Sequence, residues 1–176
     1  MNMQISSPPG QTSVPHGTAI DSRRFRSLMG AFPTGVAVIA TGWNGELYGA
    51  TINSLTSVSL QPCMLLFCTN EGSATGAAIR SRKLFSVNIL GHHQSDLSTR
   101  FTRKQKNRFE GLAVAFSADG LPLLERGRPP NSAAASPRST RRATTKSSWA
   151  KLLSGNEIAC NPLVFHKGAY GIFQRA

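Results

Sequence analysis

Acidic residues are scarce in this chain of 176 residues, which has 8 Asp and Glu against 20 Lys and Arg and a formal net charge of +12. Cysteine is scarce as well: Cys63, Cys68 and Cys160 are an odd number without metal-ligand spacing, so we predict no metal site. The first two are expected to be packing thiols on one strand. No segment is apolar enough to span a membrane, and neither a Rossmann glycine fingerprint nor a Walker loop occurs. Nucleotide binding therefore cannot be argued from either motif.

The N-terminal segment MNMQISSPPGQTSVPHG lacks the apolar run of a signal peptide. Its Pro, Ser and Gly content predicts a disordered tail over residues 1–20, and residues 21–176 suffice for one domain. We therefore expect a cytoplasmic protein.

The positive charge is concentrated in residues 126–151, where seven Lys and Arg occur without an acid, and subtracting these seven leaves +5 for the rest. Such a charge ordinarily suggests nucleic acid or an anionic membrane. This stretch, however, contains a single aromatic residue, Trp149, and so has no platform on which bases could stack. A nucleic-acid-binding module is thus a weak alternative, and we expect neither nucleic acid nor a membrane as partner. By composition the stretch is a disordered basic linker.

A β-hairpin is predicted from residue 35 to residue 57, because two segments rich in Val, Ile and Thr flank Asn44-Gly45. This dipeptide tolerates both positive φ angles of a type I′ turn. Further strands are expected at 63–69, 84–90 and 112–116, with helices at 74–82 and 94–103. A first helix, capped by Asp21 or Ser22 and ended by Pro33, carries an apolar stripe. The pattern favours an antiparallel barrel with peripheral helices.

A row of small hydroxyl and amide side chains lies where the hairpin ends, consisting of Thr51, Asn53, Ser54, Thr56, Ser57 and Ser59. Ser73 and Thr75 follow at the start of the second helix, where backbone N–H groups favour a phosphate. Such neutral donors can hold a phosphate and the polar edge of a ring without titrating. The alternative, polar side chains on a half-buried strand, fits the pattern equally well. For His92-His93 a solvated loop is the preferred interpretation over a metal site.

Seven segments resemble, in order, the short-chain flavin reductases of the FMN-binding split-barrel class. They are FRSLMGAFPTGVAVIAT, GATINSLTSVSLQP, GSAT, LFSVNIL, DLSTRF, GLPLLE and NPLVFHKGAY. The resemblance implies a mainly β fold, an antiparallel Greek-key split barrel with peripheral α-helices, assembled as a homodimer. It also implies hydride transfer from NADH or NADPH to FMN or FAD, with the reduced flavin supplied to a partner monooxygenase. A flavin-binding protein without reductase activity is the alternative.

Because the flavin carries the chemistry, we name no catalytic acid or base and no metal. The resemblance, together with the hydroxyl row, assigns to the flavin ring and ribityl chain Thr51, Ile52, Asn53, Ser54, Leu55, Ser57, Val58 and Ser59. Ser73 and Thr75 are expected at the phosphate. Phe101 and Lys104 fall where the family approaches the flavin, although a solvated helix end explains that cluster equally well. His166 and Tyr170 are expected on the nicotinamide side.

The basic stretch conflicts with this resemblance, because the family has two core strands in its place. Reading the possible codons of residues 126–151 two bases later permits GAAAKFGCRVAEIDEAGDHQIIVGE, which resembles the family and includes its Gly-Asp-His phrase. In that reading the codons of Trp149-Ala150-Lys151 yield Val-Gly and permit Glu after it. We therefore interpret residues 126–160 as out of frame and disordered, after a base insertion or deletion near Glu125 that is reversed before Asn161. A sequencing error and a genuine lesion both fit.

Overall fold

The computed structural model describes residues 19–105, 107–124, 131–142, 145–156 and 160–174, and its centre is a seven-stranded antiparallel sheet. The strand order is β3-β2-β6-β9-β10-β5-β4. These strands are β2 (Ala37–Trp43), β3 (Glu46–Ile52), β4 (Thr56–Leu60), β5 (Cys63–Asn70), β6 (Phe85–Ile89), β9 (Asn131–Arg142) and β10 (Thr145–Asn156).

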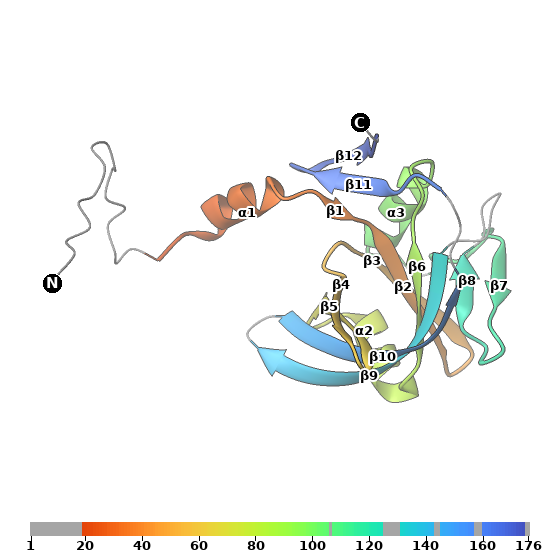
Figure 1. Cartoon of the computed structure of the whole chain (residues 1–176). Helices are drawn as coiled ribbons and strands as arrows, with labels where there is room; N and C mark the ends of the chain where they lie inside the picture. Colours follow the sequence, from red (N-terminus) through yellow and green to blue (C-terminus); the bar gives the residue numbers. More distant parts are fainter. Residues whose placement is uncertain (1–18, 106, 125–130, 143–144, 157–159, 175–176) are drawn as a thin grey trace, which may run out of the picture.

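Two smaller sheets and three helices surround the main sheet in the part of the chain that is described (Figure 1). One small sheet joins β1 (Thr34–Gly35), β11 (Leu163–His166) and β12 (Ala169–Ile172), and the other joins β7 (Val114–Phe116) and β8 (Pro122–Leu124). The helices are α1 (Ser22–Gly30), α2 (Ala74–Arg82) and α3 (Ser95–Thr102). The expected mainly β fold with peripheral helices is confirmed.

The predicted hairpin is present as β2 and β3, whose last pair is Trp43 and Glu46. Asn44 and Gly45 between them have φ angles of 50° and 79°, as a type I′ turn requires. Strand β2 is buried on both faces, because alternate side chains point to opposite sides. Ala37 and Ile39 belong to a core cluster with Phe67, Ile79 and Phe85, while Val36 and Val38 belong to a second cluster with Leu97, Phe101 and Leu163.

The hydroxyl row is divided between two strands, whereas the sequence predicted a single strand over residues 46–57. Strand β3 ends at Ile52, and Thr56 begins β4, which pairs with β5 at the opposite edge of the main sheet. Ile52 is buried in the cluster that contains Phe67 of β5, and Leu55 packs against the same cluster. Residues 53–55 therefore carry the chain from one edge of the main sheet to the other, because burial in the same core cluster stabilises both Ile52 and Leu55.

A buried polar network attaches β8 to the main sheet. The Asn88 amide nitrogen donates to the Val38 carbonyl at 3.2 Å, and its amide oxygen accepts from the Leu124 N–H at 3.1 Å. Ser86 donates to the Pro122 carbonyl at 2.6 Å. Both side chains are fully buried, so the network satisfies groups that would be costly without partners. Strand β8, from the segment GLPLLE, was not among the expected strands.

The basic stretch differs from the expected disorder. Residues 131–142 form β9 and residues 145–156 form β10, and these strands pair with each other and lie between β6 and β5. Backbone pairing needs no particular side chain, so a strand topology does not test the reading frame of the residues that occupy it. Residues 125–130, 143–144 and 157–159 lie outside the described part, as does the tail expected over residues 1–20 up to residue 18.

Helix α1 begins as predicted, since the Asp21 carboxylate accepts from the Arg24 N–H at 2.8 Å. The helix stands away from the sheets (Figure 1), and none of its residues is buried. Its apolar stripe is consequently open to solvent, with Phe25 56%, Leu28 59% and Met29 52% exposed, and Phe32 just beyond it 66% exposed. No helix of the described residues is long and apolar enough to cross a membrane.

Candidate functional site

The end of β3 meets the C-terminal hairpin and α3 at a pocket of about 150 Å³, called here the Thr51 pocket. It brings three of the predicted residues, Thr51, Ile52 and Asn53, together with Tyr170, which is 117 or more positions later in the chain. Its other lining residues are Val36, Ser98, Thr102 and Phe165.

Hydrogen bonds fix the walls of the Thr51 pocket. The Thr51 hydroxyl donates to the Ser98 carbonyl at 2.7 Å, which joins β3 to α3. The Ser98 and Tyr170 hydroxyls are 2.9 Å apart, which joins α3 to β12. Tyr170 also packs against Phe165, with ring centroids 5.6 Å apart. The phenol ring is therefore held in place while 38% of the residue stays exposed.

Ser73 and Thr75 form the start of α2, as predicted. Ser73 is the N-cap, and its side-chain oxygen accepts from the Gly76 N–H at 3.1 Å, while the Ala77 N–H goes to the Ser73 carbonyl. The first four N–H groups of a helix have no partner within it, and those of Ala74 and Thr75 find none among the described residues. The Ser73 hydroxyl still has its proton to donate. These donors fit a phosphate without any charged side chain.

Thr75 lines a second pocket of about 680 Å³, called here the Thr75 pocket, between α2, β3 and residues 105 and 107–110. Arg108 closes it by donating to the Gly49 carbonyl at 2.6 Å. Tyr48 on its wall donates to the Glu46 carboxylate at 2.8 Å, and this hydrogen bond raises the pKa of Tyr48 above its ordinary value of 10.0. The phenol is therefore a neutral group there at physiological pH.

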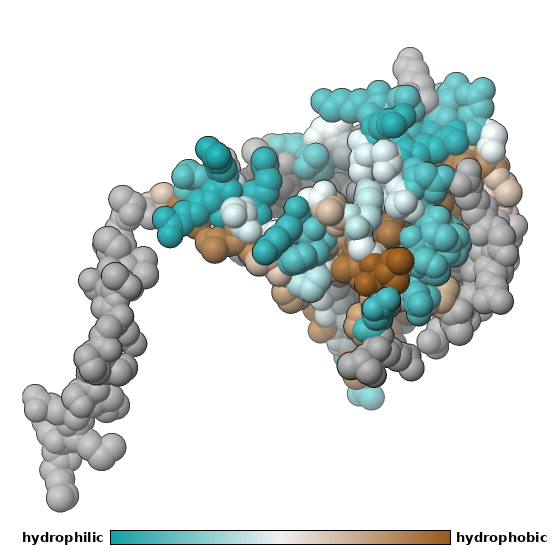
Figure 2. Space-filling model, turned by 90° about the horizontal axis from the view of Figure 1, so that it is seen from above, coloured by the Kyte–Doolittle hydropathy of each residue, from teal (hydrophilic) through white to brown (hydrophobic). Residues whose placement is uncertain are grey.

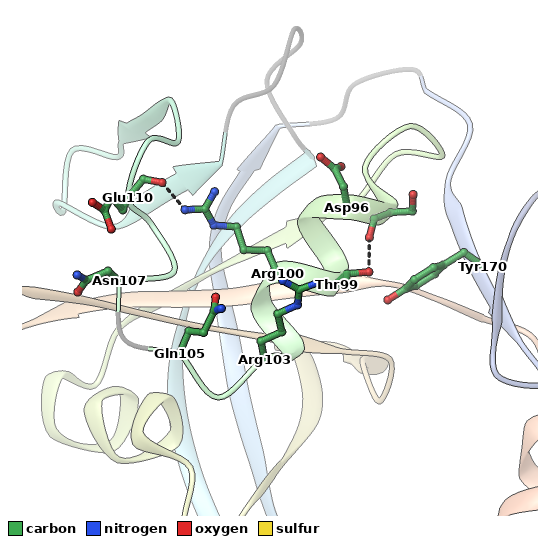
Figure 3. Close-up of a pocket in the computed structure, with 9 residues that line it drawn as sticks. Asp96, Thr99, Arg100, Arg103, Gln105, Asn107, Glu110 and Tyr170 are labelled. Carbon is green, nitrogen blue, oxygen red and sulfur yellow. Dashed lines mark hydrogen bonds between the residues drawn. The ribbon is translucent and has the colours of Figure 1, made fainter.

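A third pocket of about 840 Å³, called here the Arg103 pocket, adjoins the other two, and its lining residues are drawn in Figure 3. It shares Tyr170 with the Thr51 pocket, and it shares Gln105, Asn107 and Glu110 with the Thr75 pocket. Thr51 and Thr75, the two ends of the predicted site, thus line pockets that belong to one row of adjoining pockets.

The other predicted residues line none of these three pockets. Ser54 is turned to the chain itself, since its side-chain oxygen accepts from the Cys68 N–H at 3.0 Å. Phe101, a residue of α3, is 2% exposed and stacks edge-on with Phe109, so it anchors α3 to the core. The remaining predicted residues also lie outside these pockets. Three of them are half-buried, namely Leu55, Ser59 and Ser73, and four are exposed, namely Ser57, Val58, Lys104 and His166.

Several pocket residues were missed by the sequence analysis. Ser98 and Thr102 are four residues apart on the expected helix 94–103, and that spacing places them on one face. This signal was present in the sequence, although nothing indicated what the face meets. Arg100 and Arg103 have the same kind of spacing.

Cys63 was expected to be a packing thiol on a strand, but its side chain is exposed. His92 and His93 are exposed, as expected, and the described residues contain no metal-binding group of His, Cys, Asp or Glu.

Comparison with known proteins gives a family for this arrangement. Residues 29–130 match the family model described as "Flavin reductase like domain". The reductase component of a 4-nitrophenol 4-monooxygenase/4-nitrocatechol 2-monooxygenase from Rhodococcus opacus is 37% identical over 106 residues, which are 60% of this chain and 57% of the relative. A flavin reductase (NADH) from Kitasatospora aureofaciens is 38% identical over 122 residues, 66% of this chain and 64% of the relative. The chain thus spans less than two thirds of these relatives.

The fold agrees with solved structures. Nitrilotriacetate monooxygenase component B homolog from Mycobacterium thermoresistibile superimposes with a TM-score of 0.81 at 28% identity, covering 86% of both chains. The antiparallel split-barrel fold expected from the resemblance is therefore the fold of this chain.

Proposed function

The chain belongs to the flavin reductase-like domain family, and on that premise we propose that it is an NAD(P)H-dependent flavin reductase. The observation that carries this proposal is the row of adjoining pockets between Thr51 and the uncharged donors at the start of α2. A bound FMN or FAD would supply the hydride acceptor, and NADH or NADPH the hydride. The chain's own task is to hold the two rings in contact and to exclude water from between them.

The proposed roles of the residues follow from where they lie. Ser73, Thr75 and the two unpaired N–H groups at the start of α2 hold the flavin phosphate. Thr51, Ile52 and Asn53 present side-chain and backbone groups to the flavin ring. Loop 53–55 and β4 contribute the other residues that the resemblance assigns to the flavin, namely Ser54, Leu55, Ser57, Val58 and Ser59. Phe101 acts by supporting α3, and Lys104 and His166 reach the cofactors from the surface.

The reduced flavin is proposed to pass to a partner monooxygenase. The support is that the Rhodococcus relative is named as the reductase component of a monooxygenase, while this chain matches only part of it. Because NADH and NADPH are the reductants of the cytoplasm, we place the reaction there.

Reductase activity is tested by mixing the purified protein with FMN or FAD and NADH or NADPH, and following the loss of nicotinamide absorbance. Turnover with at least one of the four pairs is expected. Absence of turnover with all four, together with a yellow flavin-loaded protein, would instead support the alternative of a flavin-binding protein without reductase activity.

We also propose a homodimer in which the apolar stripe of α1 is covered by a second copy of the chain. Phe25, Leu28 and Met29 of α1 and Phe32 just beyond it are each at least 52% exposed, and a monomer leaves them in water. Figure 2 shows brown, apolar atoms along one edge of this segment beside teal, polar ones. Sedimentation of the variant Phe25→Glu with Leu28→Glu should show a monomer, because the charges oppose burial. Ser27→Glu lies on the opposite face of α1 and should leave the dimer intact. A wild-type monomer, or equal behaviour of both variants, would contradict this assembly.

A further inference from the structure

Helix α1 carries three arginines away from its apolar stripe. Arg23 and Arg26 are three residues apart and lie on the side of the helix opposite the stripe, together with Ser27. Arg24 lies between this side and the stripe. All three arginines are exposed, and they are called here the α1 arginines.

The α1 arginines have no counter-charge within the described residues. Helix α1 contains no acid, and none of the three guanidinium groups makes a hydrogen bond or an ion pair in the part of the chain that is described. Arg23 and Arg24 also stand in the first turn, where the partial positive charge of the helix N-terminus opposes cations. These cations therefore lower the stability of the helix. Residues that break a local rule without a structural gain are typical of functional sites.

The position of the α1 arginines suits a large anionic surface rather than a small anion. Helix α1 stands away from the sheets (Figure 1), and it contributes no residue to the three pockets described above. Side chains on a projecting helix do not surround a small anion. They can, however, reach the surface of another macromolecule.

The apolar stripe decides between the kinds of anionic macromolecule. An anionic membrane would take up the stripe itself, and the stripe is the surface proposed to be covered by the second copy. Single-stranded nucleic acid is held by cations together with aromatic side chains that stack on the bases. Phe25 and Phe32, the aromatic residues near the α1 arginines, belong to the stripe and so lie on the other side. An acidic protein surface needs only the exposed cations.

The end of α1 is joined to the hairpin that forms one wall of the Thr51 pocket. The N–H of Lys167, in the turn between β11 and β12, donates to the Gly30 carbonyl at 2.9 Å. Lys167 is exposed and adds a further cation on this side. Tyr170 of the Thr51 pocket follows three residues later on β12. A protein bound at α1 would thus adjoin the hairpin that lines this pocket.

We propose that the α1 arginines dock an acidic surface of the protein that receives the reduced flavin. The identity of this partner rests on the proposed function, which includes a flavin-accepting monooxygenase. Complementary charges on exposed surfaces steer the encounter of two proteins and raise the association rate, and this effect falls steeply with ionic strength. A short-lived complex of this kind suits a reductase that releases its partner after each transfer.

The variant Arg23→Gln with Arg26→Gln tests the docking surface in the full-length protein, with poly-L-glutamate as the acidic probe. Loss of two exposed charge contacts should weaken binding at low ionic strength about threefold to tenfold, as followed by fluorescence anisotropy. Lys83→Gln with Lys151→Gln removes two cations at other exposed positions, the C-cap of α2 and strand β10, and should bind like the wild type. Because Lys151 belongs to the basic stretch, this control also tests whether that stretch holds the probe.

Three further measurements separate docking from a structural role of the arginines. The melting temperature of Arg23→Gln with Arg26→Gln should stay the same or rise, because cations that oppose the helix dipole are removed. Sedimentation should match the wild type, since the apolar stripe is unchanged. Turnover with free flavin should also be unchanged, because α1 lines none of the three pockets.

Equal binding of poly-L-glutamate by the wild type and the arginine variant, or an equal loss in the lysine variant, overturns the proposal. Phosphatidylserine vesicles and duplex DNA are titrated in parallel. If either binds through the α1 arginines while poly-L-glutamate binds independently of them, the partner is a membrane or a nucleic acid and the proposal is wrong. Arginine-dependent binding of poly-L-glutamate in a protein without any turnover would support the acidic docking surface and reject the reductase function alone.

Discussion

The Ser73 hydroxyl has two tasks at the start of α2, since it caps the helix and is proposed to donate to the flavin phosphate. Ser73→Ala with Thr75→Ala removes hydrogen bonds to a charged group, worth about 1.5 to 3 kcal/mol each, so FMN affinity should fall roughly tenfold or more. Riboflavin lacks the phosphate and should lose much less affinity. Fluorescence titration of both ligands measures this difference.

Loss of the helix cap is a second effect of this double variant, and Ser73→Asp separates it from loss of the phosphate contact. Asp caps helices as well as Ser does, so the melting temperature should stay near that of the wild type. The added negative charge should nevertheless repel the phosphate and weaken FMN selectively. Equal losses for FMN and riboflavin in both variants would place the phosphate elsewhere.

Strand β8 depends on the side chain of Asn88, whose amide bridges Val38 and Leu124 in the interior. Asn88→Ala leaves those two backbone groups without this partner, and we expect a loss of about 2 to 4 kcal/mol in the free energy of unfolding. The melting temperature should fall by roughly 5 to 15 °C. Asn70→Ala, the same substitution at an exposed strand end, should change it little. A small effect of Asn88→Ala would show that β8 is held by its apolar contacts alone.

The paired strands β9 and β10 contain most of the basic stretch, and their stability can be measured directly. Residues 126–151 contain seven cations and no acid, a composition poorly suited to a folded core, because an isolated buried charge costs several kcal/mol or more. We therefore expect trypsin to cut first between Arg126 and Lys151, with the fragments identified by mass spectrometry. A stretch that resists trypsin in a protein with full reductase activity would reject the out-of-frame interpretation.

For the whole molecule, we predict that a gene with the frame restored over residues 126–160 encodes a more stable and more active protein. The family match ends at residue 130, close to the proposed change of frame, which supports this reading. A domain is stabilised by only about 5 to 15 kcal/mol, so replacing two core strands of the family by a basic stretch is expected to have a large effect. The test compares the melting temperature and kcat/KM of the present protein with those of the frame-restored protein, prepared in parallel. Equal values would mean that the present sequence closes the sheet adequately.

Local chemistry was sufficient to predict those features of the chain that depend on neighbouring residues. The type I′ turn at Asn44-Gly45 follows from backbone freedom, and the caps Asp21 and Ser73 follow from side chains that accept backbone N–H groups. The order of the seven motifs was enough to indicate the family. These properties need no contact between distant segments.

The tertiary structure alone decided which polar residues face a pocket. Ser54 and Asn53 are neighbours of similar chemistry, yet Ser54 is bonded to the Cys68 backbone and Asn53 lines the Thr51 pocket with Tyr170. Likewise, nothing local separates Arg100, which is held by two carbonyls, from Arg103, which has no such partner among the described residues. The physical reason is that exposure and hydrogen bonding at these positions depend on segments brought together by burial of the two core clusters, and a one-dimensional pattern does not contain those distances.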